Sequence, residues 1–243
     1  PRDAKFSDSP AEHKKKQKKL ERYLDITRAE LFFARRVVFV EGAAELMLVS
    51  ALAKRAEAGF DLRQHGVSVI SVEGLNFDCF LPLFGRAGLP IPVSIITDGD
   101  PAKEDDSSSR TVATYPDLTD EINISDNTQS LKNRSDDFIS VFHGVKTLEY
   151  DLALYRCNRN VMLDALADTN PGIAKALRIE VEAAGTNQEK AKTLFCGMFE
   201  RGSGLKNIQK GRFAQALAYQ LSQDGIEFTV PEYITNAVKH ACK

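Results

Sequence analysis

Residues 37–45 read VVFVEGAAE and residues 92–101 read PVSIITDGDP, and these two stretches decide the fold. Each begins with a short apolar run, rich in β-branched residues, that stops at an acidic residue followed by glycine. An unbroken apolar run of this length predicts a strand buried on both faces of a sheet. Two further runs, VSVISV at 67–72 and FISVFH at 138–143, extend the prediction to four strands.

The segments between these runs predict helices. AAELMLVSALAKRAEAG at 43–59 has helical spacing and should end at Gly59, and NFDCFLPLFGRAG at 76–88 is also helix-like. The order strand, helix, strand, helix, strand is typical of an α/β fold with a mostly parallel sheet and right-handed crossovers.

Three parts are expected along the chain. Residues 1–36 should form a basic helical connector, residues 37–156 the α/β core, and residues 157–243 a helical C-terminal lobe. Within the core, residues 101–137 are rich in Asp, Ser, Thr and Asn, which predicts a long polar surface loop or insertion. The lysine run HKKKQKKLER near the start is either a solvated helix face or a contact for phosphates.

Composition is that of an ordinary globular protein, with 43% hydrophobic and 27% charged residues. No apolar run approaches the roughly 20 residues that span a bilayer, and the first residues lack the apolar core of a secretory signal. The four cysteines are scattered, so we expect free thiols in a reducing cytoplasm and no zinc site. Because the chain begins with Pro1, we expect it to be a fragment of a larger protein.

Acidic residues follow two of the predicted strands directly. Glu41 comes after the first strand, with Glu45 one helical turn later, and Asp98-Gly99-Asp100 comes after the third. Ligands of open parallel sheets gather at the carboxyl ends of strands, and carboxylate oxygens suit hard cations. Taken singly, Glu45 also fits a simple helix-start acid, and an Asp-x-Asp pair also occurs in ordinary turns.

A third acidic group follows the fourth strand. Glu149 and Asp151 lie in TLEYD, and residues two apart on a regular helix point to nearly opposite faces. Both can reach one metal site only if the chain turns there. The net charge of −2 does not exclude a nucleic-acid ligand, because bound cations would neutralise such an acidic cluster.

The acidic motifs resemble those of the TOPRIM domain of topoisomerases, primases and certain nucleases. Within that superfamily, the chain looks similar to the OLD (overcoming lysogenization defect) family from about Tyr23 to Ala218, apart from the polar insertion. The resembling stretches are YLDITRAELFFARRVVFVEGAAE, VSVISVEGLNF, IPVSIITDGDP, VFHGVKTLEYDLA and KGRFAQALA. The resemblance implies a Rossmann-like TOPRIM core followed by a helical lobe.

The resemblance also implies an activity. The family's pattern is a DNA endonuclease with two Mg²⁺ or Mn²⁺ ions, joined in the full protein to an N-terminal ATPase. This chain has no G-x-x-x-x-G-K-[ST] motif for that ATPase, and the resemblance is compatible with a homodimer of the full-length protein. The implied metal ligands are Glu41, Glu45, Asp98, Asp100, Glu149 and Asp151, with Glu41 and Asp98 central to catalysis. A catalytic basic residue of the family matches Lys210, which could equally be a solvated residue at a helix start.

Two alternative functions use the same acids. One is a phosphohydrolase or nucleotidyl transferase that acts on small phosphate esters. The other is a non-catalytic assembly module in which the carboxylates hold a structural cation. A topoisomerase-like reaction would need an attacking tyrosine, and none of the six tyrosines lies in a motif that supports this role.

Overall fold

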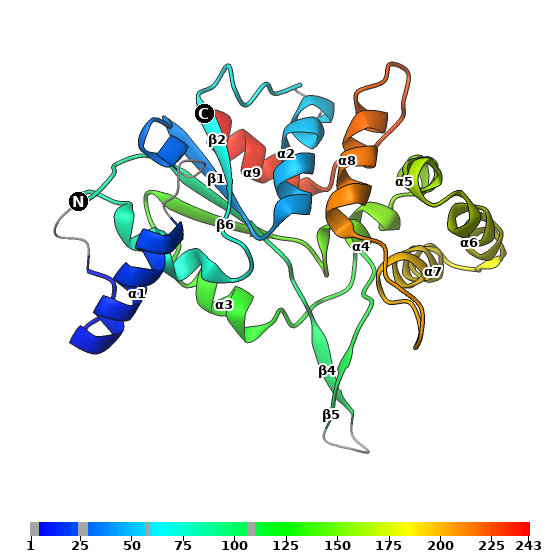
Figure 1. Cartoon of the computed structure of the whole chain (residues 1–243), viewed down its shortest axis with the longest axis horizontal. Helices are drawn as coiled ribbons and strands as arrows, with labels where there is room; N and C mark the ends of the chain where they lie inside the picture. Colours follow the sequence, from blue (N-terminus) through cyan, green and yellow to red (C-terminus); the bar gives the residue numbers. More distant parts are fainter. Residues whose placement is uncertain (1–4, 24–28, 57–58, 106–109) are drawn as a thin grey trace.

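The fold was analysed in a computed structural model that describes residues 5–23, 29–56, 59–105 and 110–243. Its centre is a four-stranded sheet in the order β2-β1-β3-β6 (Figure 1). All three pairings are parallel. The strands are β1 (Arg36–Val40), β2 (Val67–Ser71), β3 (Val93–Thr97) and β6 (Ile139–His143). The four predicted strands and the parallel α/β fold are therefore confirmed.

Alternation along the strands creates two hydrophobic cores, one on each face of the sheet. Val38 and Val40 of β1 pack into the larger core, and Val37 and Phe39 pack into the smaller one. Since successive strand residues point to opposite faces, an unbroken apolar run is needed when both faces are covered. Figure 1 shows α2, α8 and α9 on one side of the sheet and α1 and α3 on the other.

Helix α2 (Ala43–Arg55) begins immediately after β1 and covers the larger core. Its buried face includes Leu48, Val49 and Leu52, which recur at helical spacing. The helix ends at Arg55, four residues before the predicted end at Gly59, and residues 57–58 lie outside the described residues. The short crossover from β1 into α2 places Glu41 and Glu45 at the carboxyl edge of the sheet.

The helix predicted over 76–88 is not formed. The chain makes two short 3₁₀ helices instead, η2 (Asn76–Cys79) and η3 (Leu81–Leu83). Pro82 supplies no backbone N–H and disfavours a helical conformation of the preceding residue, so a continuous α-helix is blocked. Phe77 and Phe80 are buried in the smaller core, which explains why the segment is apolar without being a long helix.

At the N-terminal side, α1 (Pro10–Tyr23) carries the lysine run and η1 (Ala29–Phe32) follows it. The helical connector expected over residues 1–36 is only partly described, because residues 1–4 and 24–28 lie outside the described residues, and Arg36 already belongs to β1. Lys16 of α1 forms an ion pair with Asp78 of η2, with the two charged atoms 3.3 Å apart. One lysine of the run therefore contacts η2 and is not purely a solvated residue.

The polar segment 101–137 contains more regular structure than a surface loop. It forms an antiparallel hairpin of β4 (Ala102–Asp105) and β5 (Arg110–Ala113), followed by α3 (Asp126–Lys132). The hairpin projects from the body of the molecule (Figure 1). By contrast, Leu131 of α3 is 7% exposed and belongs to the smaller core. The expectation of a purely surface segment holds for the hairpin but is wrong for α3.

The lobe over residues 157–243 is helical, as predicted, and one more helix, α4, lies between β6 and this lobe. The helices are α4 (Leu148–Leu154), α5 (Arg156–Thr169), α6 (Pro171–Ala183), α7 (Asn187–Phe199), α8 (Lys210–Leu221) and α9 (Glu232–Cys242). Helix α8 packs on α2, and α9 packs back onto β1, β3 and β6. Among the described residues, no helix has the length and apolar character needed to cross a bilayer.

Candidate functional site

The carboxylate of Glu41 joins the ends of the two central strands. Strands β1 and β3 are hydrogen-bonded neighbours, so Glu41 and Asp98 leave the sheet side by side. Oε1 of Glu41 accepts the backbone N–H of Asp98 at 2.9 Å and the hydroxyl of Thr97. The structure thus brings together the two acids that the sequence placed at adjacent strand ends.

Glu45 lies in the first turn of α2, where it both caps the helix and lies near the other acids. Its Oε2 accepts the backbone N–H of Gly42 at 3.0 Å, which is the helix-start role that its position suggests. Burial raises the pKa of Glu45, and the nearby Glu149 carboxylate raises it further. Glu45 is therefore both a capping residue and a neighbour of the other acids.

Asp98 lies at the centre of the acidic group. Burial raises the pKa of Asp98 well above its usual range, and the charges of Glu41 and Glu45 add to this effect. Glu149 and Asp100 contribute in the same direction. Four carboxylates therefore disfavour the ionised form of Asp98, and a cation nearby would favour it.

Asp100 is held in an unusual backbone conformation. Its φ angle is 41°, in the left-handed region, and its N–H donates to the carbonyl of Lys146 at 3.2 Å. The N–H of Gly99 donates to the same carbonyl at 2.8 Å. A Cβ atom on Gly99 would lie 2.5 Å from the carbonyl oxygen of Gly144, so only glycine fits there. The Asp-Gly-Asp turn is thus built against the 144–146 segment.

Glu149 and Lys210 form an ion pair inside the site. Nζ of Lys210 lies 2.9 Å from Oε2 of Glu149, whose side chain is fully buried. Burial acts to lower the pKa of Lys210, but the charges of Glu149 and Asp98 outweigh it and leave the pKa raised. Lys210 therefore stays charged in the middle of the acids. It occupies the first turn of α8 but is not merely a solvated helix-start residue.

Asp151 faces away from this group. Its two oxygens accept the backbone N–H groups of Val145 at 3.1 Å and Lys146 at 3.0 Å. Burial raises the pKa of Asp151 to about 8, although these two donors oppose the shift. Since α4 is a regular helix, Glu149 and Asp151 point in different directions, as their two-residue spacing suggested.

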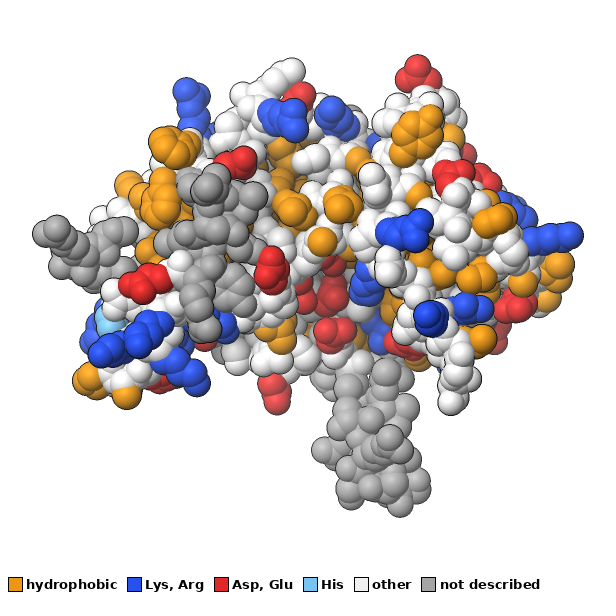
Figure 2. Space-filling model, in the orientation of Figure 1, with side chains coloured by type: hydrophobic (Ala, Val, Ile, Leu, Met, Phe, Trp, Pro, Cys, Tyr) orange, Lys and Arg blue, Asp and Glu red, His pale blue; other side chains and the backbone are white. Residues whose placement is uncertain are grey.

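In Figure 2, acidic side chains gather near the centre of the visible face, with Lys or Arg side chains beside them. This surface lies below α2 and next to α8 in the shared orientation of Figures 1 and 2. Of the acids of the site, Asp100 is exposed and Glu41 and Asp98 are half-buried, whereas Glu45 and Glu149 are buried.

Part of the chain is similar to a known protein family. Residues 32–100 match the family described as overcoming lysogenization defect protein-like, TOPRIM domain. These residues form an OLD-like TOPRIM domain. The matched range contains Glu41, Glu45, Asp98 and Asp100, whereas Glu149 and Lys210 lie beyond it. No curated protein sequence matches the chain.

Solved structures extend the likeness beyond the TOPRIM domain. The C-terminal region of the Xanthomonas campestris pv. campestris OLD protein is 28% identical, covering 88% of this chain and 94% of that one, with a TM-score of 0.57. The C-terminal region of the Burkholderia pseudomallei OLD protein is also 28% identical, covering 87% and 98%, with a TM-score of 0.56. The OLD-like TOPRIM domain and its helical C-terminal part therefore share the fold of these OLD regions, a nuclease-type fold.

TOPRIM domains generally bind divalent metal ions, and the residues of this OLD-like domain fit such an ion. Oε1 of Glu149 is buried and has no hydrogen-bond partner among the described residues. The available donors are carboxylate oxygens, which suit hard cations. No three acidic, histidine or cysteine side chains of the described residues already meet as ligands of one ion.

Lys146 is a residue of the OLD-like site that the sequence analysis did not single out. Its side chain is 5% exposed, and it lowers the pKa of Asp100, which places its charge near the acids. No sequence pattern distinguishes this lysine from the other lysines. Only its place between the fourth strand and the helix that carries Glu149 could have drawn attention to it.

Proposed function

We propose that this chain is the nuclease part of a larger ATPase–nuclease protein and hydrolyses phosphodiester bonds in DNA with two Mg²⁺ or Mn²⁺ ions. The observation that carries the proposal is the gathering of acids from the ends of β1 and β3 and from α4 around one partly exposed lysine, Lys210. Such an arrangement combines sites for divalent cations with a fixed positive charge. Both are suited to a phosphate group.

We assign the metal-binding role to five acids. They are Glu41, Glu45, Asp98, Asp100 and Glu149. Bound divalent ions supply Lewis-acid chemistry, lowering the pKa of water and stabilising charge on phosphate and leaving-group oxygens. Glu41, fixed by the Asp98 N–H, orients the central part of the site. Asp151 is left out of this set because its oxygens are already used by backbone donors.

The protein's own contribution to the chemical step comes from Lys210. Its ammonium group is charged and has Glu149 as its partner. A fixed cation of this kind stabilises the negative charge that builds up on a phosphate during attack by water. Lys210 cannot be a metal ligand while protonated, so its role is distinct from that of the acids.

A covalent tyrosine mechanism has less support than hydrolysis. Tyr233 is close enough to Asp98 and Glu149 for their charges to affect it, and burial raises its pKa well above the usual range. Burial likewise raises the pKa of Tyr150. Ionisation is what makes a phenol a good nucleophile, so these two tyrosines are poorly suited to attack a phosphate.

The domain organisation is part of the same proposal. Residues 1–36 would connect to an N-terminal ATPase, residues 37–156 would form the TOPRIM core, and residues 157–243 the helical lobe. A homodimer of the full-length protein remains a prediction. The OLD relatives are described as C-terminal regions of longer proteins, which is consistent with an ATPase outside this chain.

The decisive assay compares two substrates. Supercoiled plasmid and a chromogenic phosphomonoester are each incubated with the protein in Mg²⁺, Mn²⁺, Ca²⁺ or EDTA. We expect nicked and linear plasmid in Mg²⁺ or Mn²⁺, none in EDTA, and little turnover of the monoester. Turnover of the monoester alone would favour a small-molecule phosphohydrolase. Absence of turnover on both would favour a non-catalytic module with a structural cation.

A further inference from the structure

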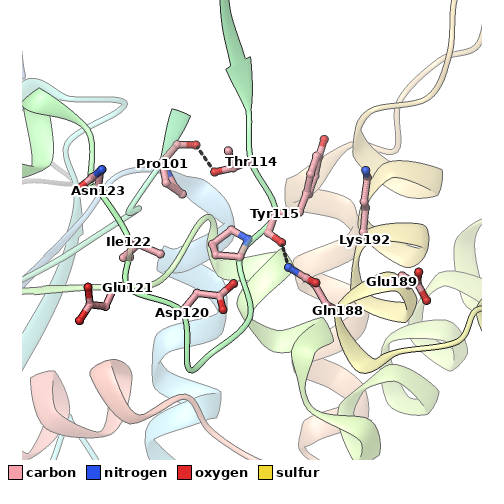
Figure 3. Close-up of a pocket in the computed structure, with 11 residues that line it drawn as sticks. Pro101, Thr114, Tyr115, Asp120, Glu121, Ile122, Asn123, Gln188, Glu189 and Lys192 are labelled. Carbon is pink, nitrogen blue, oxygen red and sulfur yellow. Dashed lines mark hydrogen bonds between the residues drawn. The ribbon is translucent and has the colours of Figure 1, made fainter. Parts of the chain in front are cut away.

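A cavity of about 790 Å³ opens beside the acidic group, between the base of the β4–β5 hairpin and α7. Figure 3 shows Pro101, Tyr115, Asn123, Gln188 and Lys192 among the residues that line it. Pro101 directly follows Asp100, so the cavity starts where the proposed metal site ends. We propose that this cavity binds the DNA strand next to the cleaved phosphodiester, with Lys146 and Lys192 contacting its phosphates. This inference rests on the proposed nuclease function.

Tyr115 fixes the positions of the two lysines. Nζ of Lys146 lies 4.6 Å from the centre of the Tyr115 ring, and Nζ of Lys192 lies 4.7 Å from it. Cation–π attraction at these distances holds an ammonium group beside a ring without neutralising its charge. Both positive charges therefore remain available for an anion.

The ring itself is anchored by its surroundings. Tyr115 packs edge-on against Tyr150 and Phe195, with ring centres 5.8 and 6.4 Å apart. The side-chain amide of Gln188 donates to the backbone carbonyl of Tyr115 at 2.6 Å, as the dashed line in Figure 3 shows. The Tyr115 ring thus packs against the larger core, and the projecting hairpin ends just before it at Ala113.

Lys146 gives the clearest indication of an anionic ligand. Although only 5% exposed, it forms no ion pair with any of the described residues, and none of them accepts a hydrogen bond from its Nζ. The Nζ atom itself is not among the buried side-chain atoms without a partner, so the ammonium group can meet an anion from the solvent. The backbone N–H of Asp100 donates to the carbonyl of Lys146 at 3.2 Å, which places Lys146 beside the Asp-Gly-Asp turn of the proposed metal site.

The cavity also contains acidic side chains, two of which already have partners. The Asp120 carboxylate accepts the N–H of Asp117 at 2.7 Å. The Glu189 carboxylate accepts the N–H of Thr186 at 2.8 Å and caps α7. These carboxylates interact with local backbone dipoles, so their charges are partly balanced. The remaining acid, Glu121, is at least partly solvent-exposed at the rim.

A nucleic-acid strand fits this chemistry better than a small anion. Sites for single strands combine lysines that follow the backbone with aromatic side chains. The two ammonium groups come from separate elements, α7 and the turn before α4, and the cavity lining includes Pro101, the residue after Asp100. A strand cut at the acids would have to continue past Lys146 and Lys192. Duplex and single-stranded DNA share this phosphate chemistry and are separated in the test below.

The test measures DNA binding apart from cleavage. Fluorescein-labelled single-stranded and duplex oligonucleotides are titrated with the protein in Ca²⁺, and anisotropy is recorded at several salt concentrations. The variants are Lys146→Met, which keeps the apolar stem, and Lys192→Ala, which changes an exposed residue. Lys175→Ala, an exposed lysine on α6, is the matched control. Thermal unfolding of each variant establishes that it is folded.

We expect each cavity variant to weaken binding several-fold and to reduce the salt dependence. The slope of log K against log salt should become shallower by about 0.9 per lost contact for duplex and about 0.7 for single strands. Lys175→Ala should bind like the wild type. If the wild type cuts plasmid but Lys192→Ala and folded Lys146→Met keep wild-type affinity and slope, the cavity proposal is overturned while the nuclease proposal stands. Lysine-dependent binding without any cleavage would support the cavity and refute the nuclease.

Discussion

Nζ of Lys210 lies 2.9 Å from Oε2 of Glu149, and the other oxygen of this fully buried carboxylate has no hydrogen-bond partner among the described residues. One oxygen is therefore neutralised by a lysine, and the other is left for a second cation. Lys210 therefore competes with a metal ion for Glu149 and does not help to bind the ion.

Replacing Lys210 by alanine should slow cleavage without weakening metal binding. The loss in rate should be roughly 100- to 1,000-fold, as for removal of one donor to a developing charge. Metal affinity should be unchanged or higher, because Glu149 loses a competing cation. Isothermal calorimetry with Mn²⁺ and plasmid cleavage measure the two effects, with the exposed Lys206→Ala as control. A variant that no longer binds Mn²⁺ would contradict this role.

Asp151→Ala should destabilise the fold, in contrast to removal of a metal ligand. It leaves the N–H groups of Val145 and Lys146 without their acceptor, at a cost of about 2–4 kcal/mol in the free energy of unfolding. Metal binding should weaken as well, because the Lys146 carbonyl holds the N–H groups of Gly99 and Asp100. Urea unfolding without metal measures the first effect.

The exposed Asp100→Asn serves as the comparison for Asp151→Ala. It should change the free energy of unfolding by less than about 0.5 kcal/mol while still weakening metal binding. Equal stability of Asp151→Ala and the wild type would show that Asp151 does not position the turn.

The hairpin should be dispensable for folding, whereas α3 should not. Replacing residues 102–113 by a short Gly-Ser linker should leave one cooperative unfolding transition, since the hairpin projects from the body (Figure 1). Leu131→Ala in α3 should cost about 2–5 kcal/mol, because this side chain is buried in the smaller core. Circular dichroism during urea unfolding measures both. Loss of cooperativity in the hairpin deletion would show that the hairpin is part of the core.

His240 should make the free energy of unfolding fall as the pH drops below about 6.5. Burial lowers the pKa of His240, and the charges of Lys243 and Arg36 lower it further. The ring lies between the hydroxyls of Ser94 and Ser140. A His whose folded pKa is below the unfolded value of about 6.5 adds stability above that pH, and this is lost as pH falls through the folded pKa. His240→Gln should flatten the fall in melting temperature below pH 6.5, and an unchanged fall would contradict the assignment.

The strands and the paired acids could be predicted because both depend on local pattern. Val37–Val40 and Val93–Thr97 are apolar runs, and Glu41 and Asp98 follow them directly, so a parallel sheet must bring these acids to one edge. The separation of Glu149 from Asp151 was also foreseeable from helix geometry.

Other features depend on long-range contacts that no local pattern encodes. The lysine at 146 is ordinary in sequence, and it becomes unusual only because Tyr115 and the acids surround it in the fold. Helix α9 packs against β1, β3 and β6. The spacing of apolar residues within α9 predicts a helix but not which elements it contacts. Leu131 likewise became a core residue through tertiary packing of a polar segment.

The most direct measurement of the central claim is cleavage of supercoiled plasmid by wild-type protein and by Asp98→Asn across a titration of Mg²⁺ or Mn²⁺. We expect the wild type to cut only with metal and to stop in EDTA. Asp98→Asn should lose roughly 100-fold or more in rate. It should still fold, with a melting temperature without metal at or above that of the wild type, because one charge leaves an acidic cluster. Full cleavage in EDTA, or by folded Asp98→Asn, would contradict a metal-dependent nuclease centred on these acids.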